Sequence, residues 1–102
     1  KYAQQGDLAG AVALIQQIPE IGVRDETLRN LAVELVSLGR KDEALSLANA
    51  TGSSASANEL IYSVLEAMVE QGDAGDAIYL ARHLPDAMAR GIALAIIARV
   101  LS

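Results

Sequence analysis

The chain has 102 residues, of which 52% are hydrophobic and 3% aromatic, and its formal net charge at pH 7 is −5. So apolar a chain can bury a core, which excludes a disordered segment, and its acidic balance argues against nucleic acid, because phosphate binding needs a basic face. Without cysteine and with one histidine, disulfides, thiolate sites and multi-histidine metal centres are excluded, and we expect no cofactor and no metal.

Hydrophobic spacing predicts an all-α fold of about six helices and no β-strand. In the first helix, apolar residues recur at steps of three and four from Leu8 to Ile18, which places them on one helical face. The predicted helices, in chain order, lie near residues 7–17, 25–38, 41–50, 57–71, 74–83 and 86–101.

Prolines, glycines and acidic residues mark the expected helix ends. Asp7 and Asp73 suit N-caps, because a carboxylate accepts free backbone N–H groups there. Pro19 and Pro85 end two of the short helices, whereas residues 50–54 form a loop of small residues. The longer helices are expected to end at glycines, which tolerate the left-handed backbone that closes many helices.

The whole pattern repeats without a gap every 33 residues. Gly6, Gly39 and Gly72 are each 33 residues apart. The same step relates three columns of apolar residues, which are Leu28, Ile61 and Leu94; Leu31, Val64 and Ile97; and Leu35, Met68 and Leu101. The period divides residues 1–102 into units at 6–38, 39–71 and 72–102, with residues 1–5 as the end of a preceding helix. One unit cannot bury its own apolar faces, so stacking must complete the burial.

Within this period, six residues carry a family resemblance: Leu28, Leu31, Ala32, Leu35, Gly39 and Ala44. Their order of large, small and glycine positions resembles the tetratricopeptide (TPR) repeat, although the period is 33 residues rather than about 34 and Leu65 stands where the middle unit should have a small residue. The resemblance implies a right-handed α-solenoid of antiparallel helix hairpins, built as a single domain. It also implies a scaffold that binds proteins, not an enzyme.

The resemblance further implies a concave groove lined by the longer helix of each unit. Its partner would be a protein or peptide, basic or amphipathic in character, with Tyr62 as an anchor. The alternative is an ordinary solvated face with this tyrosine half-packed between helices. By register the predicted groove residues are Glu26, Arg29, Asn30, Val33, Glu59, Tyr62, Ser63, Glu66 and Arg99, with Ala95 and Ile96 beside them.

The last helix suggests an alternative function. The segment Ile92–Leu101 is apolar nearly all round, and such a helix should be buried. Either further units follow in a longer protein, or the chain forms a homo-oligomer as a self-associating structural solenoid; the third reading is a core helix with a partly apolar surface. The residues predicted for self-association are Ile92, Ile96, Ile97 and Leu101.

Other features have structural explanations. His83 fits the end of a short helix, where the dipole favours a cation. Asp73 and Asp76 do not follow the EF-hand spacing for calcium. No segment reaches the roughly 18 uninterrupted apolar residues of a membrane span. We therefore expect no membrane partner and a soluble protein, cytoplasmic rather than secreted.

Overall fold

The computed structural model describes residues 5–102, and in this part of the chain all regular structure is helical, which confirms the all-α prediction. The elements are α1 (Gln5–Gln16), α2 (Ile21–Ser37), α3 (Lys41–Ser46), the 3-10 helix η1 (Leu47–Ala50), α4 (Ser54–Glu70), α5 (Ala74–Arg82) and α6 (Ala87–Leu101). No helix in the described range is long and apolar enough to cross a membrane.

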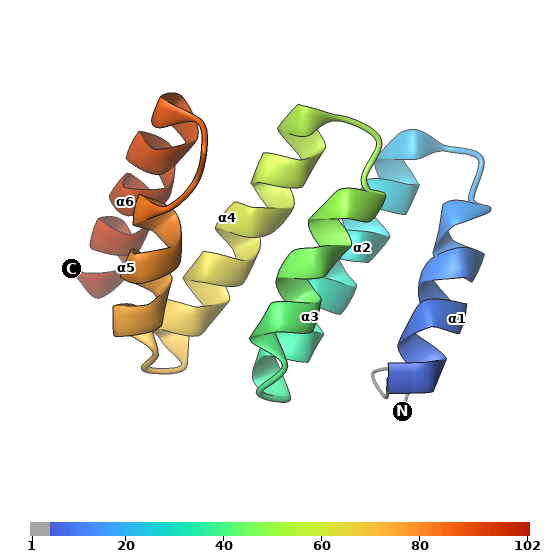
Figure 1. Ribbon diagram of the computed structural model, residues 1–102, viewed down its shortest axis with the longest axis horizontal. Helices are drawn as coiled ribbons and strands as arrows, with labels where there is room; N and C mark the ends of the chain where they lie inside the picture. The colour runs from blue at the N-terminus through green and yellow to red at the C-terminus, as the bar shows by residue number, and fades with distance from the viewer. Residues whose placement is uncertain (1–4) are drawn as a thin grey trace.

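The helices are arranged so that each contacts its near neighbours in chain order. The long helix α4 packs against α2 on one side and α6 on the other, and these three follow one another across the molecule (Figure 1). The short helix α3 folds back on α2, and α5 packs against both α4 and α6. The molecule measures 37 × 26 × 20 Å along its principal axes.

Glycine closes two of the long helices as the repeat predicts. Gly39 and Gly72 have positive φ angles of 78° and 88°, which glycine adopts without the steric penalty of a side chain. After α2, the Gly39 N–H donates to Val36 O (3.0 Å) and the Arg40 N–H to Leu35 O (2.9 Å). This pair of bonds is the Schellman motif, and α4 ends in the same way.

Two long helices begin earlier than the sequence indicates, at Ile21 and Ser54. For α4 the reason is Ser53, whose hydroxyl accepts a hydrogen bond from Ser56 N (3.1 Å) and so caps a helix start inside the predicted loop. In the third predicted helix, the α-helix stops at Ser46 and continues as η1, because the last turn of a helix often tightens to 3-10 geometry.

The predicted start of the first unit is wrong. Gly6 and Asp7 lie inside α1, so Asp7 is not its N-cap and no turn precedes it at Gly6. The glycine turns at 39 and 72 each close a long helix, whereas the expected preceding helix falls on residues 1–4, outside the described residues, and Gln5 already belongs to α1. Asp73 does occupy an N-cap position, but its side chain makes no capping hydrogen bond.

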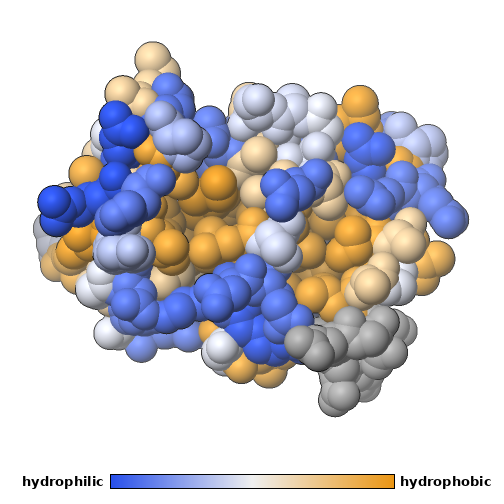
Figure 2. All heavy atoms as spheres, in the orientation of Figure 1, coloured by the Kyte–Doolittle hydropathy of each residue, from blue (hydrophilic) through white to orange (hydrophobic). Residues whose placement is uncertain are grey.

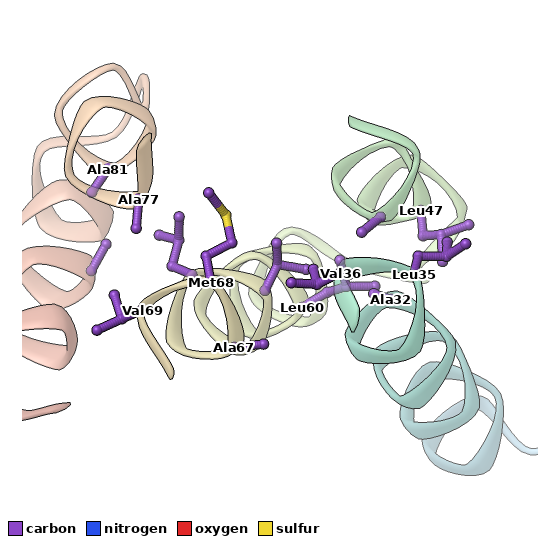
Figure 3. Packing of buried hydrophobic residues seen from close by; sticks show 14 of the residues in the cluster. Ala32, Leu35, Val36, Leu47, Leu60, Ala67, Met68, Val69, Ala77 and Ala81 are labelled. Carbon is purple, nitrogen blue, oxygen red and sulfur yellow. The ribbon is translucent and has the colours of Figure 1, made fainter. Parts of the chain in front are cut away.

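The core lies where the long helices meet the short ones. Its largest fully buried side chains come from α2 and α4: Leu28, Leu35, Leu60, Leu65, Met68 and Val64. In Figure 3, Val36 of α2 lies beside Leu60 of α4, and Leu35 lies beside Leu47 of η1. Ala77, Ala81 and Ala93 are also fully buried, and their small side chains allow α4, α5 and α6 to pack closely.

Candidate functional site

The predicted groove residues, called here the candidate surface, include two ion pairs that link consecutive long helices. Arg29 Nη1 on α2 lies 3.5 Å from Glu59 Oε1 on α4. Glu66 Oε2 on α4 lies 3.6 Å from Arg99 Nη2 on α6. The structure therefore brings four of the predicted residues together in two pairs, each of which joins neighbouring helices.

These pairs change the expected charge of the candidate surface. The sequence places Glu59 and Glu66 on one face of a helix, which suggests an acidic surface, but each carboxylate faces an arginine from the next helix. The side chains are 30% to 68% exposed, so each attraction is screened by solvent and weak. The surface offers paired charges, which is a poorer match to a purely basic partner than an unpaired acidic cluster would be.

Tyr62 is half-buried and packs against the core. Burial raises the pKa of its hydroxyl, and the nearby Asp86 carboxylate raises it further, because both disfavour the tyrosinate form. Tyr62 therefore has the half-packed position of the alternative reading, with only part of its ring available to a partner.

The remaining residues of the candidate surface are mixed in chemistry. Glu26 and Asn30 are exposed on α2, and Val33 is 39% exposed. The Ser63 hydroxyl donates to Glu59 O (3.1 Å), within its own helix. Ile92 of α6, which is in register with Glu26 and Glu59, is 42% exposed, so the surface carries apolar side chains on both outer helices.

The four residues predicted for self-association do not all reach the surface. Ile92 and Leu101 are 42% and 56% exposed, whereas Ile97 is only 2% exposed and belongs to the core. Ile96 is half-buried. Ile97 must therefore be removed from any contact surface, because the side of α6 that carries it already packs within the chain.

A hollow of about 460 Å³ lies between α1 and the α3–η1 segment, and the sequence gives no signal for it. It is lined largely by Leu8, Val12, Ala13 and Leu47. Apolar residues are visible between the short helices in Figure 2. Such a hollow arises from the separation of two short helices, which no spacing within one helix reveals.

A cluster of charged side chains joins the starts of α3 and α5. Lys41 Nζ lies 3.2 Å from Asp73 Oδ2 and also donates to Asp76, and these carboxylates raise the pKa of the lysine. Beside it, Arg40 donates to Glu43 through Nη2 (2.6 Å) and Nε, which lowers the pKa of the Glu43 carboxyl. The aspartates with calcium-like chemistry are thus paired with a lysine.

His83 is the C-cap of α5, as expected. Its Nδ1 lies 2.7 Å from Tyr79 O, and its ring lies against that of Tyr79 with centroids 4.2 Å apart. Within residues 5–102, no group of three or more histidine, cysteine, aspartate or glutamate side chains is placed to hold a metal ion.

Comparison with known proteins adds no relative. No protein-family model, curated protein or solved structure matches the chain.

Proposed function

We propose that this chain is a protein-interaction module, a TPR-like α-solenoid of three units, that binds an amphipathic helix or peptide across α2, α4 and α6. The observation that supports this most is the pair of cross-helix contacts Arg29–Glu59 and Glu66–Arg99. Residues chosen only by their position in the repeat meet across consecutive long helices, as expected for side chains of one continuous surface.

The mixed chemistry of the candidate surface favours an amphipathic partner. Val33 and Ile92 offer apolar contacts on the outer helices, and Glu26 and Asn30 offer polar ones. Exposed apolar side chains bordered by polar residues suit a helix or peptide with one apolar face. We propose binding rather than catalysis, since the charged pairs are solvent-exposed and no dry pocket surrounds them.

The test compares the wild-type chain with variants that change only this surface. A Glu59→Ala, Tyr62→Ala, Glu66→Ala triple variant and a separate Val33→Arg variant would each be used to enrich partners, which mass spectrometry identifies. Binding of the purified partner would then be measured by calorimetry. Tyr79→Arg is the control, because Tyr79 is 60% exposed on α5, away from the long helices.

We expect the control to keep the wild-type partner and affinity, and both surface variants to lose at least tenfold in affinity. Circular dichroism must show that each variant is folded, and Val33→Arg covers the case in which loss of the half-buried Tyr62 destabilises the chain. Equal affinity of the wild type and Val33→Arg, together with unchanged partners for the triple variant, would remove the proposal.

A further inference from the structure

Both ends of the helix array leave uncovered a face that is buried elsewhere in the chain. On α2, Leu28, Ala32 and Leu35 are all fully buried, and the elements packed on α2 include α3, η1 and α4. Residues 66 positions later occupy the same places on α6, and there Leu94 and Leu101 are 37% and 56% exposed. The intermediate helix α4 buries the column, with Leu65 at 0% and Met68 at 1%.

The short helix α1 shows the opposite deficit. In the middle unit, Ala44 is fully buried and Leu47 is 3% exposed, where α3 and η1 pack against the preceding long helix α2. The residues in register on α1 are Ala11, which is half-buried, and Leu14, which is 66% exposed. Within residues 5–102, no long helix precedes α1 to cover them.

The two open faces are the two halves of a contact that the chain already forms internally. Leu35 of α2 lies beside Leu47 of η1 in Figure 3. Leu101 is in register with Leu35, and Leu14 is in register with Leu47. A long helix with the first face open and a short helix with the second face open are therefore complementary in shape and residue type.

Charge does not oppose this contact. From Leu8 to Gln17, α1 and the residue after it contain no charged side chain. On α6, Arg99 pairs with Glu66 and Arg90 donates to Leu84 O (2.7 Å), so neither arginine needs the open face. Covering both faces would bury apolar side chains without stripping water from a charge, which is the favourable case for association.

We propose that the chain stacks head to tail on a second copy of itself, with α6 of one copy packed against α1 of the next as α2 packs against α3. This goes beyond the proposed groove function, because it uses faces of α6 and α1 that are distinct from the candidate surface. The two faces differ, so the contact is heterologous: it leaves one α1 and one α6 free in a dimer and extends into larger assemblies.

The experiment measures molar mass by light scattering over a wide concentration range, for the wild-type chain and for Leu14→Arg, Leu101→Arg and Met88→Arg. We expect the wild type to grow beyond a dimer as concentration rises, and each of the two leucine variants to stay monomeric. An equimolar mixture of Leu14→Arg and Leu101→Arg should form a heterodimer that grows no further, because each variant keeps the end that the other lacks. Met88→Arg is the control, since Met88 is 72% exposed at the start of α6 and its register equivalents Gly22 and Ala55 are exposed too.

Each other outcome overturns the proposal. A wild-type chain that remains monomeric up to its solubility limit has no such contact. If Leu14→Arg still associates while Leu101→Arg does not, two α6 helices meet each other instead, and if the mixture of variants gives no heterodimer, the faces do not pair. All substituted residues are exposed, and circular dichroism with thermal unfolding must show that every variant folds like the wild type.

Discussion

Arg29 of α2 and Glu59 of α4 lie 3.5 Å apart across two neighbouring long helices. The second such pair, Glu66 with Arg99, joins α4 to α6 at 3.6 Å. In both pairs the acid comes from the central helix and the arginine from an outer one, so α4 is the electrostatic link between its neighbours.

We predict that the Arg29–Glu59 pair contributes little to stability. Both side chains are partly solvent-exposed, and exposed ion pairs typically contribute about 0.2–1 kcal/mol. A double-mutant cycle with Arg29→Gln and Glu59→Gln, measured by urea unfolding, should give a coupling energy in that range that decreases at high salt. The control cycle replaces Glu59 by Glu70 and should give no coupling; an equal coupling there would contradict a specific pair.

The positive φ angle of Gly72 makes it intolerant of a side chain. Gly72→Ala should lower the free energy of unfolding by about 1–2 kcal/mol, because an L-residue is strained in the left-handed region. Gly91 is the control: it lies inside α6 with no atom within 4 Å of an added Cβ, so Gly91→Ala should stabilise by about 0.5–1 kcal/mol. Denaturant unfolding measures both, and a stabilising Gly72→Ala would show that the turn does not need glycine.

Position in the array, rather than residue type, should set the cost of truncating a leucine. Leu28→Ala removes a fully buried side chain and should cost about 2–5 kcal/mol. Leu94→Ala, at the same place in the repeat but 37% exposed, should cost clearly less. Both variants should be unfolded at low protein concentration, where chains do not associate; equal losses would mean that α6 is covered as fully as α2.

The Arg40–Glu43 contact predicts a dependence of stability on acid. The arginine lowers the folded-state pKa of Glu43 below that of the unfolded chain, so the folded state binds its proton less readily. The resulting stabilisation is present above the unfolded pKa and is lost as the pH falls through the folded one. Chemical unfolding of the wild type and Glu43→Gln should differ at neutral pH and converge in strong acid, and a gap that persists there would exclude this ionisation as its source.

The sequence predicts local structure well wherever the cause is local. The two glycine turns, the helical C-cap at His83 and the helix count for the described residues all follow from residue type and hydrophobic spacing. The errors occur where another side chain decides the outcome. Ser53 caps α4 inside a predicted loop, and Asp73 interacts with Lys41 instead of capping α5.

The candidate surface could be located from the repeat but not described chemically. Register alone selects Glu59 and Glu66, yet spacing along one helix cannot show that arginines from two other helices face them. The distance between helices sets that pairing. The same limitation explains Tyr62, whose partial burial depends on the neighbouring helices and not on its place within α4.

By itself, the sequence determined that this chain is all-α, that a 33-residue register relates its helices, and where glycine must close two of them. Those properties depend on backbone conformation and on apolar spacing within single helices. Only the tertiary structure decided that Ile97 is buried at 2% exposure while Leu101, four residues later, is 56% exposed. Both are apolar residues of one helix, and they differ because packed elements cover one side of α6 and leave the other side open.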